Sequence, residues 1–449
     1  MPRILLTTRC RDTGLYDYFR ENAPRNFRWR FGMPRRISFG LRFLRQNIPG
    51  ITILEYPARS EYSAQLRRGW DAVGFSFYLE ETNLILDMAR EARAAGVPQL
   101  WAGNYGALTP SIQSTFDHVF SSYSEEALAQ LLDVPLEEIQ HPPLITEFRF
   151  PGGWSIPVGV LFSSRGCSFR CTFCQTTAFA PQPKPISLES LDRVLHFYTS
   201  HGVRFILMLD ENFGNIPSHA ESVIELLARH RVRWLVQSRV DLFLRNFDNW
   251  QACGMEGALF GIESFHQEIL KQMHKNEKVQ AAFELAERLN TTGLYAHGYY
   301  IIGLPSETPE SIAADLRTLA SLELDVTQIT IVTPHPQTEM WRDLESNYGI
   351  FEKDWSKFDT KHLVWNHPHC APGVLEGLLE QGFRNCYEGD WLKRTVKKFV
   401  AKRWRDRDTV GIFTGPLGAR LAAPRRLPFL PMRRPVTGMV PDRASAATA

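Results

Sequence analysis

The chain has 449 residues, 44% of them hydrophobic and 22% charged, and it contains no apolar run of the ~18 residues that a membrane span requires. Its net charge of +2 is uneven: residues 393–449 hold 14 Lys or Arg against 3 Asp or Glu, a balance of +11, which leaves −9 for residues 1–392. A basic tail on an acidic body argues against a nucleic-acid-binding protein, whose positive charge more often covers a folded face.

The N-terminal 145 residues predict alternating strands and helices. The run "MPRILLTT" is too short for a secretory signal, and we interpret it as a first strand. Further strands are predicted at residues 71–77, 97–103 and 117–122, and residues 83–96 have helical periodicity and end in glycine. Short strand–helix–strand connections predict a parallel sheet with helices on its faces. Residues 141–153 are rich in proline and glycine and are predicted to be a linker.

The same rhythm then repeats six times. The predicted strands are residues 158–164, 204–210, 233–240, 257–263, 295–304 and 327–334. The predicted helices between them are residues 187–201, 217–230, 243–253, 266–290 and 308–322. Repeated β–α units of this length build a parallel sheet, either open or curled into a barrel. In both arrangements ligands bind at the C-terminal ends of the strands.

Three of the seven cysteines lie together directly after the first of these strands. Cys167, Cys171 and Cys174 have the spacing C-x3-C-x2-C, and no fourth cysteine is near. An odd number of cysteines in a long chain does not suit a disulfide framework and favours a reducing, cytoplasmic compartment. Three thiolates could hold an iron–sulfur cluster with one open iron, or a zinc ion completed by a distant side chain. They could also be three buried thiols.

The residues around these cysteines add a family resemblance. Phe173 lies directly before the third cysteine, and the segment "SSRGCSFRCTFC" resembles the cluster loop of the radical S-adenosylmethionine (SAM) superfamily. The resemblance implies that Cys167, Cys171 and Cys174 hold a 4Fe–4S cluster whose open iron binds the amino and carboxylate groups of SAM. One-electron reduction then yields a 5′-deoxyadenosyl radical, which abstracts a hydrogen atom from the substrate.

The resemblance extends over about residues 155–335 through short motifs at successive strand ends. It implies SAM contacts from Phe173, Asp210, Glu211, Arg239, Glu263, Ile302 and Gly303. In "LDENF" the two acids replace family glycines, which is similar to the cobalamin-associated branch. Arg239 would face the SAM carboxylate, and Glu263 the ribose. As alternatives, Glu211 and Glu263 could be solvated acids. The segment "GLPSET" could be a helix start capped by Ser306 or Thr308.

The N-terminal region is similar to the cobalamin-binding Rossmann-like domain that precedes many radical SAM barrels, and residues 39–57 fit its first helix and second strand. The resemblance implies cobalamin contacts from Gly74, Ser76, Gly103, Asn104 and Gly106. The chain has no D-x-H-x-x-G motif, whose histidine ligates cobalt in many relatives, and "AGNYGA" stands where relatives often have G-G-P-H-A. The alternative is a lid that shapes the active site without binding cobalamin.

The resemblance fades after residue 340, where residues 341–405 are predicted to form a short helical region. His367, His369 and Cys370 could bind a metal, but we expect a loop packed against the barrel or facing the substrate. The isolated histidines His118 and His297, like His196, are interpreted as packed or exposed rather than catalytic.

A basic amphipathic helix is predicted over residues 391–407. Its apolar stripe consists of Leu392, Val396, Phe399, Val400 and Trp404. The pattern suits an anionic membrane surface, or equally a helix docked on the barrel by its apolar stripe. Residues 406–449 are basic and proline-rich, and their composition predicts disorder.

The fold expected is α/β: a Rossmann-like domain over residues 1–145, a partial (β/α)6 radical SAM barrel over residues 155–340, and a helical C-terminal region. The leading reaction, implied by the resemblance, is methyl transfer to an unactivated carbon, in which methylcobalamin donates the methyl group and a second SAM regenerates it. The alternatives are a cobalamin-independent rearrangement, cyclisation or C–C coupling, and a non-catalytic metal-binding regulator. The expected partners are a small-molecule or lipid-like substrate and an electron donor such as flavodoxin or ferredoxin. Peripheral contact with an anionic membrane is also expected, and contact with nucleic acid is not.

Overall fold

The computed structural model describes residues 2–11, 23–24, 32–34, 37–149 and 155–405, without the side chains of residues 403–405. Residues up to Lys402 form one compact unit. The predicted tail, residues 406–449, lies outside the described residues. Within the described part of the chain, no helix is both long enough and apolar enough to cross a membrane.

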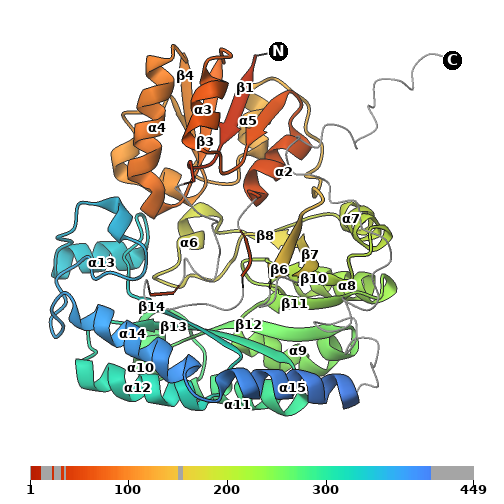
Figure 1. The fold of residues 1–449 in the computed structure, drawn as a ribbon, viewed down its shortest axis with the longest axis vertical. Helices are drawn as coiled ribbons and strands as arrows, with labels where there is room; N and C mark the ends of the chain where they lie inside the picture. Colours follow the sequence, from red (N-terminus) through yellow and green to blue (C-terminus); the bar gives the residue numbers. More distant parts are fainter. Residues whose placement is uncertain (1, 12–22, 25–31, 35–36, 150–154, 406–449) are drawn as a thin grey trace. The chain divides into compact units, whose positions relative to one another are not determined.

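The N-terminal sheet is parallel, as predicted, with the order β2-β1-β3-β4-β5 (Figure 1). Its strands are β1 (Ile4–Thr7), β2 (Ile51–Leu54), β3 (Ala72–Ser76), β4 (Gln99–Gly103) and β5 (His118–Val119). Its helices are α2 (Phe39–Asn47), α3 (Arg59–Leu66), α4 (Thr82–Ala94) and α5 (Glu125–Leu131). Alternate residues of β1 face opposite sides: Leu5 joins the core under α3 and α4, whereas Ile4 and Leu6 join the core under α2 and α5. This period of two buries both faces of the sheet.

The second sheet curls into a partial barrel with the order β14-β13-β12-β11-β10-β7-β6. Its parallel strands are β7 (Ser155–Leu161), β10 (Phe205–Met208), β11 (Arg233–Gln237), β12 (Met255–Glu263), β13 (Tyr295–Ile302) and β14 (Val326–Ile331). The helices between them are α7 (Leu188–Ser200), α8 (Pro217–Arg229), α9 (Val240–Ala252), α10 (Gln267–Gln272), α11 (Val279–Thr292) and α12 (Pro309–Ser321). The outward faces of the strands pack on these helices in the main core, and the inward faces form a smaller apolar cluster.

Two sequence predictions were wrong in this region. The predicted linker contains β6 (Ile145–Arg149), which pairs antiparallel with β7 as an edge strand. The predicted helix at residues 266–290 is two helices, α10 and α11, separated by a loop in which His274 and Asn276 have positive φ angles of 53°. Backbone in that conformation cannot continue a right-handed helix.

The C-terminal region is helical, as expected, with α13 (Glu339–Asn347), α14 (Val374–Tyr387) and α15 (Trp391–Arg405). The last helix docks on the barrel through Leu392 of its apolar stripe and through two lysines. Lys398 Nζ lies 2.6 Å from Asp325 Oδ2, and Lys402 Nζ lies 3.2 Å from Glu256 Oε2, at the N-terminal ends of β14 and β12. Val396, Phe399 and Val400 are 52%, 41% and 45% exposed, so most of the predicted stripe faces outward.

Candidate active site

The cysteine loop (residues 166–175) connects strand β8 (Ser164–Arg165) to the short helix α6 (Thr176–Phe179). Strand β8 pairs with β9 (Lys184–Pro185), which follows that helix. Gly166 has a φ of +94°, and a Cβ there would lie 2.5 Å from Gln182 O, so only glycine fits the first turn. The Cys167 N–H donates to Ala180 O at 3.0 Å, and the Thr172 N–H donates to Met273 O at 3.0 Å. The loop is therefore fixed at its start and in its interior.

The three thiols are free and partly buried. Burial raises the pKa of each thiol, that of Cys171 to about 11, although the positive charges of Lys275 and Arg239 lower the pKa of Cys171. Among the described residues, no three His, Cys, Asp or Glu side chains converge closely enough to hold a single metal ion.

The two acids after β10 have different roles. The Asp210 carboxylate is buried and accepts four hydrogen bonds, from the N–H and hydroxyl groups of Ser163 and Ser164 at 2.6–2.9 Å. Burial raises the pKa of Asp210 to about 6, although these hydrogen bonds lower it. Both oxygens are occupied, so Asp210 positions the start of the cysteine loop. Glu211 accepts a hydrogen bond from Gly166 N–H at 2.9 Å and another from the hydroxyl of Tyr123 in the N-terminal domain.

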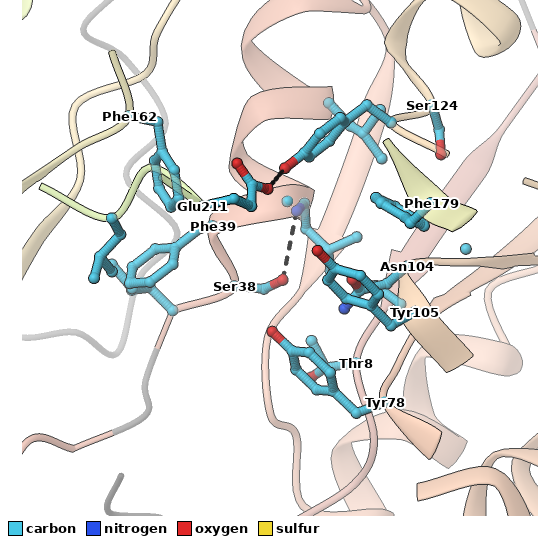
Figure 2. A pocket seen from close by; sticks show the side chains of 18 of the residues that line it. Thr8, Ser38, Phe39, Tyr78, Asn104, Tyr105, Ser124, Phe162, Phe179 and Glu211 are labelled. Carbon is cyan, nitrogen blue, oxygen red and sulfur yellow. Dashed lines mark hydrogen bonds between the residues drawn. The ribbon is translucent and has the colours of Figure 1, made fainter. Parts of the chain in front are cut away.

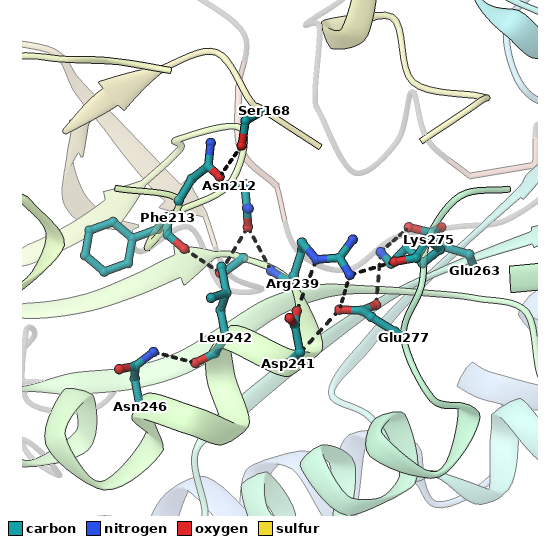
Figure 3. Close-up of polar contacts among 12 residues, drawn as sticks. Ser168, Asn212, Phe213, Arg239, Asp241, Leu242, Asn246, Glu263, Lys275 and Glu277 are labelled. Atoms are coloured by element: carbon teal, nitrogen blue, oxygen red, sulfur yellow. Dashed lines mark hydrogen bonds and ion pairs between the residues drawn. The ribbon is translucent and has the colours of Figure 1, made fainter. Parts of the chain in front are cut away.

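A buried network of charges lies beside the loop (Figure 3). Lys275 Nζ lies 3.1 Å from Glu263 Oε1 and 3.5 Å from Glu277 Oε2, and all three side chains are at most 10% exposed. Burial opposes the Lys275 ammonium, but the two carboxylates raise its pKa above the ordinary value. Arg239 lies 3.5 Å from Glu277 and donates to Lys275 O at 2.6 Å. The guanidinium also stacks 4.2 Å above the ring of Phe169 in the cysteine loop.

Two donors in this network have no partner in the part of the chain that the structure describes. They are Nη1 of Arg239 and Nδ2 of Asn212, and both are buried. Asn212 uses its Oδ1 to accept from the Arg239 N–H at 3.1 Å, which aligns the two side chains (Figure 3). Unpaired buried donors cost free energy, so their persistence indicates a site for an anionic or polar ligand.

The remaining predicted SAM residues act through packing or backbone. Ile302 is fully buried in the barrel core. Gly303 has a φ of +80°, and a Cβ there would meet Leu375 at 2.7 Å. Phe173 is partly buried against the same core. Thr308 is the N-cap of α12, as one alternative predicted, and accepts from Ser311 N–H.

The His367 cluster is a packed loop rather than a metal site. Nδ1 of His367 accepts from the N–H groups of His369 and Cys370 at 3.1 and 3.0 Å, and its Nε2 lies 3.0 Å from Leu304 O. Both ring nitrogens are occupied. This loop therefore closes over the end of β13, as the packed-loop interpretation predicted.

A cavity of about 410 Å³ lies between the N-terminal domain and the barrel (Figure 2). The N-terminal domain contributes small residues at strand ends, and the barrel contributes the inward side chains of β10 to β13. Of the residues predicted to contact cobalamin, Gly74, Ser76, Gly103 and Asn104 line the cavity. Gly106 is not among the lining residues; a Cβ there would lie 2.3 Å from the ring of Phe77.

The wall of the cavity has features of a ligand site. Asn104 has φ 70° and ψ −173°, a conformation that few residues other than glycine adopt and that is held only under constraint. The first 145 residues contain two histidines, and neither lines the cavity. His118 packs on Trp101 with ring centroids 6.1 Å apart, and both ring nitrogens of the buried His141 are hydrogen-bonded. A corrinoid in this cavity would have no histidine ligand from the N-terminal domain.

Sequence reasoning did not identify Lys275, Glu277 or Tyr123. Lys275 and Glu277 fell inside one predicted helix, and the signal that could have revealed them is the polar segment "HKNEK" that interrupts its apolar periodicity. Tyr123 lies in a loop of the other domain, and only the folded structure brings it to Glu211.

Comparisons with known proteins agree with this arrangement. Residues 161–319 match the profile of the Radical SAM superfamily. An uncharacterized methyltransferase of Pyrococcus horikoshii is 28% identical over 239 residues, 52% of this chain and 52% of that protein. An anaerobic magnesium-protoporphyrin IX monomethyl ester cyclase of Cereibacter sphaeroides is 26% identical over 54% of this chain and 40% of its own length. The chain thus spans about half or less of these relatives.

The fold is also that of a solved structure. The radical SAM methyltransferase TsrM from Kitasatospora setae, solved with cobalamin and a 4Fe–4S cluster, superposes with a TM-score of 0.58 at 15% identity. The superposition covers 77% of this chain and 78% of that protein. It confirms the predicted α/β fold, with a Rossmann-like domain, a partial barrel and a helical C-terminal region.

Proposed function

We propose that this chain is a radical SAM enzyme that cleaves SAM at a 4Fe–4S cluster to methylate an unactivated carbon with the help of cobalamin; the match of residues 161–319 to the radical SAM profile supports this. One observation carries the proposal. Glu211 lines the cavity and accepts hydrogen bonds from Gly166 in the cysteine loop and from Tyr123 in the N-terminal domain, so it connects the loop to the cavity and to that domain.

The residues present fit the cluster and SAM. Cys167, Cys171 and Cys174 would hold the cluster, and no fourth cysteine would occupy its last iron. The unpaired N–H donors of Arg239 and Asn212 would donate to a carboxylate such as that of SAM. When bound, the cluster supplies the electron that cleaves SAM, and cobalamin supplies the methyl group. The chain positions these groups, and its buried ion pairs hold the donors in place before the ligand arrives.

The cobalamin assignment is tested by reconstitution with hydroxocobalamin. We expect stoichiometric binding, and a Co(II) electron paramagnetic resonance spectrum without nitrogen splitting from the N-terminal domain, because His118 and His141 do not reach the cavity. Any splitting from His297, which lines the barrel side of the cavity, would disappear in His297→Leu. Nitrogen splitting from an imidazole of the N-terminal domain would contradict the expectation that this domain supplies no histidine ligand to cobalt. Failure to bind any corrinoid would favour the alternative, a radical cyclisation or rearrangement at the barrel alone.

The substrate would be a small or lipid-like molecule, and a flavodoxin or ferredoxin would deliver the electron. We also propose peripheral contact with an anionic membrane through α15. Its polar face is held by Asp325 and Glu256, while Val396, Phe399 and Val400 are exposed beside Lys393 and Lys397. Each such cation near an anionic surface contributes roughly 1 kcal/mol.

The membrane contact is tested by sedimentation with vesicles. Truncation at residue 391 would remove Trp391 and Lys398, which contact the barrel, so point substitutions are preferable. We expect binding to anionic vesicles at low salt, release as salt rises, and loss of binding in Val396→Ser/Phe399→Ser. The control Val374→Ser changes an apolar residue that is 38% exposed on α14 and should bind normally. Equal recovery with neutral and anionic vesicles would refute the contact.

A further inference from the structure

The floor of the cavity is formed by side chains that point into the barrel. The strand register places Gln237, Leu259 and His297 in one row across β11, β12 and β13, so these three side chains share the inward face. In the adjoining row, Leu235 pairs with Gly257 and Gly257 with Tyr295. All of these except Gly257 line the cavity.

The floor is mostly apolar. Leu207, Leu235 and Leu259 form one buried cluster with Val158, and Tyr295 and Tyr299 pack against it. The charged residues lining the cavity, among those the structure describes, are Glu81, Glu125 and Glu211, and none belongs to the floor. Glu81 and Glu125 are ion-paired with Arg9 and Arg165, which do not line the cavity, so the described residues of the lining offer no cation to an anionic substrate. An apolar molecule would be held here by burial of its surface.

His297 is a buried polar residue on this mostly apolar floor. It is 3% exposed, and its Nε2 has no hydrogen-bond partner among the described residues. Its ring lies against Tyr299, with centroids 4.7 Å apart. Burial lowers the pKa of His297 to about 3, so the imidazole is neutral at physiological pH and offers a hydrogen bond without charge. The side-chain amide of Gln237, two strands away, lines the same cavity.

A second buried histidine shows that the fold can satisfy such a ring. Nε2 of His141 accepts from Phe162 N–H at 3.0 Å, and its Nδ1 lies 2.6 Å from Pro142 O. His141 is as deeply buried as His297, yet both of its nitrogens are used. An unpaired polar group in a barrel floor costs stability, and such groups occur where a ligand completes them.

We infer that His297 determines substrate specificity by hydrogen-bonding the one polar group, a hydroxyl or carbonyl, of an otherwise apolar and uncharged substrate. The inference rests on the proposed function, because it assigns the substrate of that same cavity. It explains why the barrel keeps an imidazole where Leu259 and Leu235 would otherwise complete an apolar floor. His297 is one row from Gly261, over which the Glu263 carboxylate and Lys275 ammonium lie, so the bound polar group would sit below the SAM-binding rim.

Two measurements on the full chain with its cluster test the inference, and neither needs SAM cleavage. The first is unfolding in denaturant. His297→Leu removes an unpaired group and should raise the midpoint, whereas the matched change His141→Leu leaves Phe162 N–H unpaired and should lower it. A midpoint for His297→Leu that falls as far as that of His141→Leu, or failure of His297→Leu to fold, would overturn the inference.

The second measurement is binding of 1-octanol, 1-chlorooctane and octanoate by calorimetry. We expect 1-octanol to bind the wild type about fivefold to tenfold more tightly than His297→Leu, as loss of one hydrogen bond predicts. His297→Gln should retain most of this affinity. 1-Chlorooctane should bind both proteins equally, and octanoate should bind neither. Equal losses for 1-octanol and 1-chlorooctane, or tight binding of octanoate, would contradict the inference, as would cobalt–nitrogen splitting that disappears in His297→Leu.

Discussion

Two regions of the barrel differ in how their buried polar groups are paired. They are the rim, formed by Arg239, Glu263, Lys275 and Glu277, and the floor of the cavity, which contains His297. At the rim, Arg239 and Lys275 are surrounded by Glu263 and Glu277, and each charge is compensated within 3.5 Å. On the floor, one neutral imidazole is left without a partner among leucines. A rim of this kind is prepared for an ionic cofactor, and a floor of this kind selects an uncharged substrate. Under the proposed function, one barrel would therefore carry two recognition sites with different chemistry.

The largest effect on this comparison is expected from the cysteine loop. Cys167→Ala should abolish both the cluster and the release of 5′-deoxyadenosine from SAM, because two thiolates cannot retain the cluster. Absorption spectra and iron content of the anaerobically purified protein measure the cluster, and chromatography measures the released 5′-deoxyadenosine. Cys253→Ala changes a cysteine at the C-terminal end of α9 and should behave as wild type. Full 5′-deoxyadenosine production by Cys167→Ala would show that Cys167 is not a cluster ligand and would contradict the proposed SAM site at the rim.

A large loss of stability is expected from the ion pairs of the rim. Lys275→Met leaves Glu263 and Glu277 buried without their cation, and breaking a buried pair costs about 3–5 kcal/mol. The control Lys184→Met breaks an ion pair with Glu126 whose side chains are 69% and 67% exposed, for which about 0–1 kcal/mol is expected. Denaturant unfolding of both variants measures the difference. Similar losses in the two would mean that the rim is not organised by its charges.

A smaller effect is expected where the N-terminal domain meets the rim. Tyr123→Phe removes a hydrogen bond to the Glu211 carboxylate and should cost about 1.5–3 kcal/mol. Tyr105→Phe removes a neutral hydrogen bond to Thr176 at 3.0 Å and should cost about 0.5–1.5 kcal/mol. Unfolding free energies in this order would show that a charged acceptor joins the domains. The reverse order would place the main link at Tyr105.

Sequence patterns predicted much of the fold because hydrophobic periodicity is local. The six parallel strands of the barrel, the N-terminal sheet and the cysteine loop all lie where the pattern placed them. Strand β6 was not predicted because the prolines and glycines on both sides of "ITEFR" are typical of a loop. The break before α11 was missed because apolar residues continue on both sides of Lys275.

Contacts between distant segments could not be predicted in the same way. The apolar stripe of α15 predicted how that helix would dock, but Lys398 and Lys402 decide its orientation through Asp325 and Glu256, whose positions depend on the folded barrel. His297 was recognised as a residue of a strand, yet its missing partner becomes evident only when the neighbouring strands are in register.

We propose that this barrel holds a SAM-cleaving cluster next to a methyl-carrying corrinoid. The most direct test incubates the anaerobically purified full chain with cobalamin, a reductant and SAM, after measuring its metal content. The account predicts about four irons per chain and formation of both 5′-deoxyadenosine and S-adenosylhomocysteine, the two products expected when one SAM gives a radical and another a methyl group. Zinc in place of iron, or the absence of both products, would contradict it.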